Sequence, residues 1–270
     1  MIETHHTSMI EPTLAAAAFG DQPARWPLPT ATSPSELWLR AVAAGGQGRY
    51  GSAYRDLAVL RRSIPAGRLV SLAHSTQGSF LRQLGWHARA RGWDGRALVL
   101  AGADPEARAD ALIGLAADAL GVGRFAAAAT LLARADSELT AGVPDRLPVR
   151  RRWVAAELAM ARGDGTIAVR HAEEAVEFAQ TMEASERHRV KSDVVLAAAL
   201  CSAGAIDRAR TVAEAALDAT GRFGLIPLRW ASACLLFDIG SVTISAPKLA
   251  EIRDICAGQM RRAGGTWPSG

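Results

Sequence analysis

One short segment has the glycine spacing of a dinucleotide-binding loop, because Gly46, Gly48 and Gly51 spell G-x-G-x-x-G. Such a loop holds a pyrophosphate when it follows a β-strand and when an acidic residue for the ribose lies about 20 residues further on. Here the segment follows residues 36–44, which read as a helix. We therefore interpret it as a turn between helices and expect no nucleotide cofactor.

The histidines and serines form no recognisable catalytic or metal-binding pattern. No two of the six histidines have the His-Glu-x-x-His spacing that binds zinc, and His171 fits a solvated helix face. Ser75 and Ser79 lie near His74 but not in the strand-turn-helix setting of a nucleophile. We predict that the chain is not an enzyme, with no catalytic residues, no metal and no cofactor.

The chain is basic, with a formal net charge of +4, and its densest basic stretches are residues 150–152 and 187–191. Contacts of these stretches with nucleic-acid phosphates are one interpretation. However, only two of the 31 basic residues are lysines, a bias typical of a GC-rich genome. Both stretches also begin expected helices, where solvated charge is common. Nucleic acid is therefore not the expected partner.

Cysteine usage and hydropathy both point to a cytoplasmic protein. The three cysteines are widely spaced and include no Cys-x-x-Cys pair, which argues against a disulfide framework or a zinc site. No apolar run approaches the 18 residues of a spanning helix, and no basic segment precedes the short apolar run at residues 14–19 as in a signal peptide. We expect no membrane partner.

Any functional residues would have to be positioned by helices, because Ala, Leu, Arg and Glu dominate the composition. Glycines interrupt the Ala/Leu-rich stretches at intervals of 31 to 44 residues. A period of this length, with two helices per unit, is typical of a helical solenoid. The glycines taken as these interruptions are Gly48, Gly92, Gly123, Gly163, Gly204 and Gly240.

The boundaries of the helical region follow from proline and glycine. Five prolines between Pro12 and Pro34 predict a flexible N-terminal tail over residues 1–33. A single repeat domain of about six units is expected over residues 34–263. Residues 264–270 are glycine-rich and predict a frayed C-terminus.

Residues 34–67 resemble a tetratricopeptide repeat over its whole length. Leu37 and Ala41 fit the first helix, Gly48 the turn, and Ala53 the small residue where the two helices cross, followed by Leu57, Leu60 and Pro65. The frame recurs in four further units, with Gly-Arg-aromatic turns at residues 48–50 and 123–125, and a sixth unit is atypical. The resemblance implies an all-α, right-handed solenoid of helical hairpins.

The same resemblance implies a binding surface, because the first helix of each unit lines the concave groove in this family. Four of the seven tryptophans then face the groove beside basic residues, which would suit a protein or peptide with apolar anchors and acidic flanks. The implied partner-binding residues are Trp38, Val42, Arg82, Trp86, Arg89, Ile113, Arg150, Trp153, Glu157, Met160, Lys191, Val194, Trp230 and Phe237.

Two alternatives stay open at this point. A shift of the frame by one residue would place the tryptophans between helices, so they fit the core as well as the groove. The expected function is a protein- or peptide-binding scaffold. A regulatory module linked to transcription, sensing a peptide or touching nucleic acid through arginines, is the alternative, and an enzyme on a helical scaffold is the second alternative. The sequence does not specify an oligomeric state.

Overall fold

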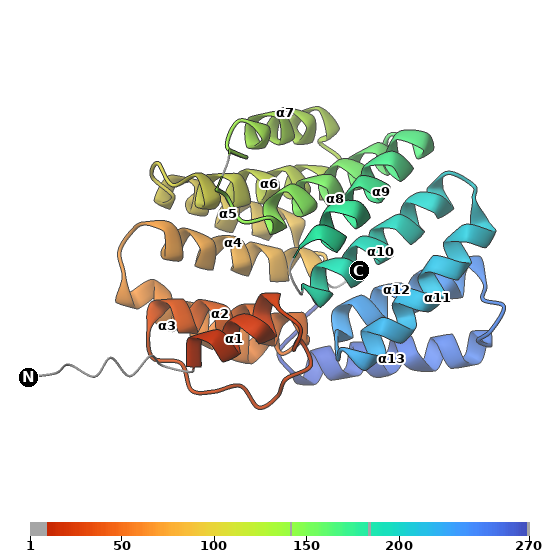
Figure 1. Cartoon of the computed structure of the whole chain (residues 1–270), viewed down its shortest axis with the longest axis horizontal. Helices are drawn as coiled ribbons and strands as arrows, with labels where there is room; N and C mark the ends of the chain where they lie inside the picture. The colour runs from red at the N-terminus through yellow and green to blue at the C-terminus, as the bar shows by residue number, and fades with distance from the viewer. Residues whose placement is uncertain (1–9, 141, 183–184, 269–270) are drawn as a thin grey trace, which may run out of the picture.

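The computed structural model describes residues 10–140, 142–182 and 185–268. Over these ranges the fold is all-α, with thirteen helices and no strand (Figure 1). The parts of the two termini at residues 1–9 and 269–270 lie outside the described residues. The helices are α1 (Ile10–Phe19), α2 (Pro34–Gly46), α3 (Tyr50–Ser63), α4 (Arg68–Gln83), α5 (His87–Leu100), α6 (Pro105–Gly121), α7 (Phe125–Asp136), α8 (Arg146–Ala161), α9 (Gly165–Thr181), α10 (Glu186–Ser202), α11 (Ile206–Arg222), α12 (Ile226–Ile239) and α13 (Ala246–Arg262).

Helices α2 to α13 form six hairpins. We call the first member of each hairpin a leading helix (α2, α4, α6, α8, α10 and α12) and the second a trailing helix (α3, α5, α7, α9, α11 and α13). Each trailing helix packs against its own leading helix and, except for α13, against the leading helix that follows. Consecutive leading helices also contact one another. This side-by-side order is consistent with a helical solenoid (Figure 1).

The hairpin turns repeat one hydrogen-bonded motif, which the third hairpin illustrates. Gly123 has a φ of 75°, a left-handed conformation that is strained for a residue with a Cβ atom. The amide of Arg124 then donates to the carbonyl oxygen of Ala119 at 2.8 Å, which satisfies a carbonyl group at the end of α6. Equivalent bonds close the turns at Gly48, Gly85, Gly163 and Gly204.

The prediction that Gly92 makes the second hairpin turn was wrong. Gly92 lies inside α5, and Gly85, with a φ of 83°, makes the second turn. With Gly85 in place of Gly92, the turn glycines recur every 36 to 41 residues. This spacing is more regular than the 31 to 44 residues expected from the sequence. The error arose because a lone glycine inside a helix is tolerated at a cost of about 1 kcal/mol and resembles a break.

The N-terminal segment differs from the expected tail. Helix α1 packs against α2, and Leu14, Ala17 and Ala18 are buried. The segment that follows is held by side chains of the first hairpin, since the amide nitrogen of Gln47 donates to the carbonyl oxygens of Pro23 and Arg25 at 2.8 and 2.9 Å. Residues 10–19 are therefore packed on the first hairpin, because Pro12 lies in the first turn of α1, where a proline is tolerated, and the apolar run that ends at Phe19 is buried against α2.

The row of hairpins curves until its last member meets its first. Tyr50 packs against Met260, and the amide of Gly51 donates to the carbonyl oxygen of Ala263 at 2.7 Å. The segment expected to fray continues across the second hairpin, where the indole nitrogen of Trp86 donates to the carbonyl oxygen of Thr266 at 2.6 Å. Residues 264–268 thus lie against the body, and the concave surface is closed at the point where α13 reaches α3.

Candidate ligand-binding cavity

The leading helices enclose a cavity of about 400 Å³, which we call the central cavity. All six leading helices contribute to its wall. Phe19 at the end of α1, His87 at the start of α5 and Met260 on α13 also line it, so both ends of the row take part. A volume of this size falls within the range of small-ligand sites, about 300–1,000 Å³. The leading helices, which the sequence predicted to line a groove, thus line a cavity of this size.

Nine of the fourteen predicted groove residues line the central cavity. They come from six different hairpins, as expected for residues of leading helices in register. These residues are Trp38, Val42, Arg82, Ile113, Arg150, Trp153, Glu157, Lys191 and Trp230.

The other five predicted groove residues do not line the cavity. Trp86 and Arg89 were placed on a leading helix by the mistaken turn at Gly92, whereas α4 ends at Gln83 and both residues belong to the start of α5. Met160 packs beside α9 in a separate apolar cluster. The cavity meets only the first turns of α10 and α12, so Val194 and Phe237 lie further along these helices.

Several wall residues were not predicted. Arg146 lies one helical turn before Arg150 on α8, and Arg187 lies one turn before Lys191 on α10, so helical spacing could have identified both. Phe19 and Met260 come from elements outside the leading helices, and nothing in the repeat frame points to them. Phe19 was also missed because residues 1–33 were expected to form a flexible tail.

The tryptophans are both core and cavity wall. Trp38 is 8% exposed and donates from its indole nitrogen to the Thr76 hydroxyl at 3.1 Å, which ties α2 to α4. Trp153 donates in the same way to the Ser192 hydroxyl at 2.9 Å, which ties α8 to α10. Each indole therefore joins two leading helices while it contributes a surface to the cavity. The two placements left open by the sequence are not exclusive.

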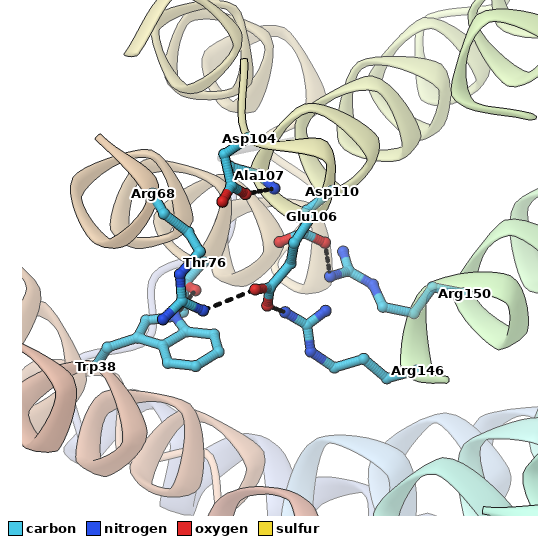
Figure 2. A network of polar contacts seen from close by, with 9 residues as sticks. All are labelled: Trp38, Arg68, Thr76, Asp104, Glu106, Ala107, Asp110, Arg146 and Arg150. Carbon is cyan, nitrogen blue, oxygen red and sulfur yellow. Dashed lines mark hydrogen bonds and ion pairs between the residues drawn. The ribbon is translucent and has the colours of Figure 1, made fainter. Parts of the chain in front are cut away.

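Acids of α6 pair with arginines of two other leading helices, of which Arg146 and Arg150 of α8 line the cavity. Glu106 accepts from Arg68 of α4 at 2.7 Å and also pairs with Arg146 of α8 (Figure 2). One turn further along α6, Asp110 pairs with Arg150, also from α8. Figure 2 shows both guanidinium groups of α8 directed at these carboxylates. These bonds fix the arginine side chains before any ligand arrives.

Arg187 differs from the other cavity arginines because, among the described residues, it has no acidic partner. Its nearest acceptor is the carbonyl oxygen of Val42 at 3.5 Å, and its guanidinium carbon lies 5.5 Å from the ring centre of Phe19. Burial lowers the pKa of Arg187 to about 10, with Arg150 and Arg146 adding repulsion. The group is still a cation at neutral pH.

Arg82 is held by two buried carboxylates. It bonds to Asp118 at 2.9 Å and to Asp94, and both acids are fully buried. Burial raises the pKa values of Asp94 and Asp118, while Arg82 opposes the shift. A Cβ atom at Gly78 or Gly114 would lie 2.4 Å from Asp94, so both glycines make room for this carboxylate.

His188 is a neutral part of the wall. It is 2% exposed, its Nδ1 atom lies 2.7 Å from the Ser185 hydroxyl, and its ring stacks on Trp153 at 5.5 Å. Burial, with repulsion from Arg187, Arg146 and Arg150, holds the pKa of His188 well below 6.5. Its role in the wall is to pack and to accept or donate one hydrogen bond.

The wall combines aromatic surfaces with cationic side chains. No group of three or more His, Cys, Asp or Glu side chains among the described residues could hold a metal ion. No described helix is long and apolar enough to cross a membrane.

The chain matches no protein-family model, and a search of the curated proteins finds no relative.

Proposed function

We propose that this chain is a binding module that receives a short peptide segment in the central cavity. The observation that carries the proposal is the convergence of all six leading helices on one cavity, with Trp38, Trp153 and Trp230 in its wall. Aromatic side chains with a polar tip are frequent anchors of protein ligands. The tetratricopeptide-like frame, a right-handed solenoid with its ligand on the concave side, is part of the same proposal.

The size of the cavity limits what the module holds. A volume of about 400 Å³ accommodates a few residues rather than a long helix or a folded domain. The bound segment would supply an aromatic or apolar anchor and an acidic group, since the wall combines indole rings with arginines. A partner protein would therefore be recognised through one exposed terminus or loop.

A regulatory role is the second candidate function, and the closure of the row favours it. The first and last hairpins meet beside the cavity, where Gly51 bonds to Ala263. A ligand that contacts both ends of the row would stabilise this closed arrangement. A partner protein that binds the closed arrangement more tightly would then respond to the ligand. Peptide sensing fits this arrangement, in the cytoplasm that the free cysteines Cys201, Cys234 and Cys256 suggest.

Contact with nucleic acid has less support. Arg150 pairs with Asp110, Arg151 with Asp136 at 2.7 Å, and Arg189 with Glu186 at 2.8 Å. Arginines engaged with carboxylates do not form an open basic surface for phosphates.

A heptapeptide phage library screened against the immobilised chain tests the proposal. We expect enrichment of peptides with one aromatic and one acidic residue, whose binding is then measured by isothermal titration calorimetry. Ala117→Phe fills the cavity from α6 and should abolish binding, while Ala127→Phe on the exposed face of α7 should not. A library without enriched peptides, or equal binding to both variants, would contradict the proposal.

A further inference from the structure

Three arginines gather at one end of the central cavity, and we call them the arginine cluster: Arg146, Arg150 and Arg187. The first two lie one turn apart on α8, so they share a helix face, and Arg187 comes from the neighbouring leading helix α10. The guanidinium carbons of Arg146 and Arg187 lie 5.4 and 5.5 Å from the same Phe19 ring. The cluster is therefore a single site built from two leading helices and α1.

Carboxylates do not balance the charge of this site. Glu106 is shared by Arg68 and Arg146, and Asp110 pairs with Arg150. Arg187 has no acidic partner among the described residues. The three arginines of the cluster and these two acids leave a local net charge of 3 − 2 = +1, and one of the acids is also shared with Arg68. An anionic ligand would balance this excess of positive charge.

Two donors of the cluster also lack good acceptors. The Nη1 atom of Arg146 is buried and has no hydrogen-bond partner, although Nη2 of the same group bonds to Glu106. Arg187 has only its long bond to the Val42 carbonyl oxygen. Buried donors without acceptors are rare in folded proteins because losing their hydration is costly. Both side chains line the cavity, but the Nη1 atom of Arg146 is itself buried, so the partly exposed Arg187 is the donor that a ligand can reach.

An apolar surface adjoins these donors. The Phe19 ring packs on Trp38 with centres 5.4 Å apart, and the guanidinium carbon of Arg146 lies 5.6 Å from the Trp38 ring centre. A ligand anion would thus sit beside two aromatic rings. The arrangement fits an anionic group attached to an apolar or aromatic one.

We propose that the arginine cluster is the subsite for a carboxylate group of the bound peptide, with Arg187 as its donor and with Arg146 and Arg150 adding positive charge beside it. The inference rests on the proposed function, which it deepens by naming the charged group that is recognised. A guanidinium presents two parallel donors that match a carboxylate. In a peptide this carboxylate is either the C-terminal one or the side chain of an acidic residue.

Calorimetric titration of the full chain with N-acetylphenylalanine and with its neutral amide tests the subsite directly. The two probes share the aromatic ring and differ in the carboxylate. We expect the acid to bind at least about tenfold more tightly, the effect of one charge-assisted hydrogen bond. Equal affinities for acid and amide would overturn the proposal, as would tighter binding of phenyl phosphate than of the acid.

A third probe separates the two sources of the carboxylate. The dipeptide of phenylalanine and glutamate, blocked at both ends, carries only a side-chain carboxylate. If it binds more tightly than N-acetylphenylalanine, the subsite takes an acidic side chain; if it binds more weakly, the subsite takes the C-terminus. Either result supports recognition of a carboxylate, provided that the neutral amide binds more weakly than both.

The variant Arg187→Gln assigns the effect to a residue. It should weaken binding of the acid about 10–100-fold, leave the amide unchanged and leave the thermal midpoint at or above that of wild type, because Arg187 holds no acid in the free protein. Arg187→Lys should recover part of the affinity. Arg189→Gln, which removes a charge paired with Glu186 on the same helix, should bind the acid like wild type.

Unchanged affinity of Arg187→Gln for the acid would overturn the subsite. The result is distinguishable from failure of the proposed function. If the library peptides bind and Ala117→Phe abolishes this binding while Arg187→Gln does not, peptide binding stands and the subsite falls. If the acid binds through Arg187 and no peptide is enriched, the subsite stands and the peptide function falls.

Discussion

The leading and trailing helices differ in which residues they bury, as α6 and α9 show. On the trailing helix α9 the fully buried residues are four alanines at helical spacing, Ala168, Ala172, Ala175 and Ala179, so one narrow stripe faces the protein. On the leading helix α6, buried residues occur on every side and include Glu106, Asp110 and Asp118. Leading helices such as α6 thus bury acids together with apolar residues, whereas a trailing helix such as α9 buries only small apolar ones.

The difference teaches where function is to be sought in this fold. A buried charge costs free energy unless it is paired, so it is expected mainly where binding requires it. The arginines of the buried pairs, Arg82, Arg146 and Arg150, all lie on leading helices, although the Asp94 partner of Arg82 lies on the trailing helix α5. The pair of Arg208 with Glu173, on the trailing helices α11 and α9, is exposed instead.

The largest expected effect breaks the buried ion pairs of Arg82, which joins the leading helices α4 and α6 to the trailing helix α5. Arg82→Met would leave Asp94 and Asp118 buried without their cation, and we expect it to lower the free energy of unfolding by about 3–5 kcal/mol. Arg208→Met removes a solvent-exposed pair and should cost less than about 1 kcal/mol. Urea unfolding at pH 7 measures both, and equal losses would remove the distinction between the two sets of helices.

A smaller effect tests the alanine stripe of the trailing helices. Ala128 is fully buried on α7, and its neighbour Ala127 is exposed on the same helix. Ala128→Leu should destabilise the protein by about 1–3 kcal/mol, because the larger side chain separates α7 from α6. Ala127→Leu has the same helix propensity and should change stability by less than about 0.5 kcal/mol. Thermal unfolding of the two variants that gave the same midpoint would show that the stripe is not tightly packed.

The smallest effect concerns pH and the leading helix α10. His188 stays neutral in the folded state, because its pKa lies well below 6.5, but binds a proton near pH 6.5 once the chain unfolds. Its stabilising contribution is therefore complete above pH 6.5 and is lost as the pH falls below that value, at up to about 1.4 kcal/mol per pH unit.

The variant His188→Gln should show a flatter dependence of unfolding free energy on pH between 7 and 5. His171→Gln, on the trailing helix α9, should keep most of the wild-type slope because that ring is paired with Glu174 and lies closer to solvent. A wild-type slope in His188→Gln would contradict the assignment of a neutral buried imidazole.

The sequence predicted the hairpins better than the cavity, for physical reasons. Turn glycines such as Gly123 and crossing alanines such as Ala53 are local requirements of the hairpin, so their spacing is visible in one chain. The turn of the second unit was assigned to Gly92 because no local sequence feature distinguishes this glycine inside α5 from the turn glycine Gly85.

The closure of the cavity could not be predicted from spacing. It depends on contacts between residues about 200 positions apart, such as Tyr50 with Met260, and on the packing of α1 beneath the first hairpin. Arg187 was visible only as part of a basic stretch, and its lack of an acidic partner depends on which helices meet at α10. Such features require the assembled fold.

The most direct test of the central claim is methyl NMR of isoleucine-labelled protein, titrated with the tightest heptapeptide from the library. Ile113 lies in the cavity wall on leading helix α6, while Ile167 and Ile255 are exposed on trailing helices α9 and α13. We expect the δ1 methyl resonance of Ile113 to shift and those of Ile167 and Ile255 to stay in place. Shifts of Ile167 or Ile255 with Ile113 unmoved would show that the ligand binds outside the cavity and would contradict this account.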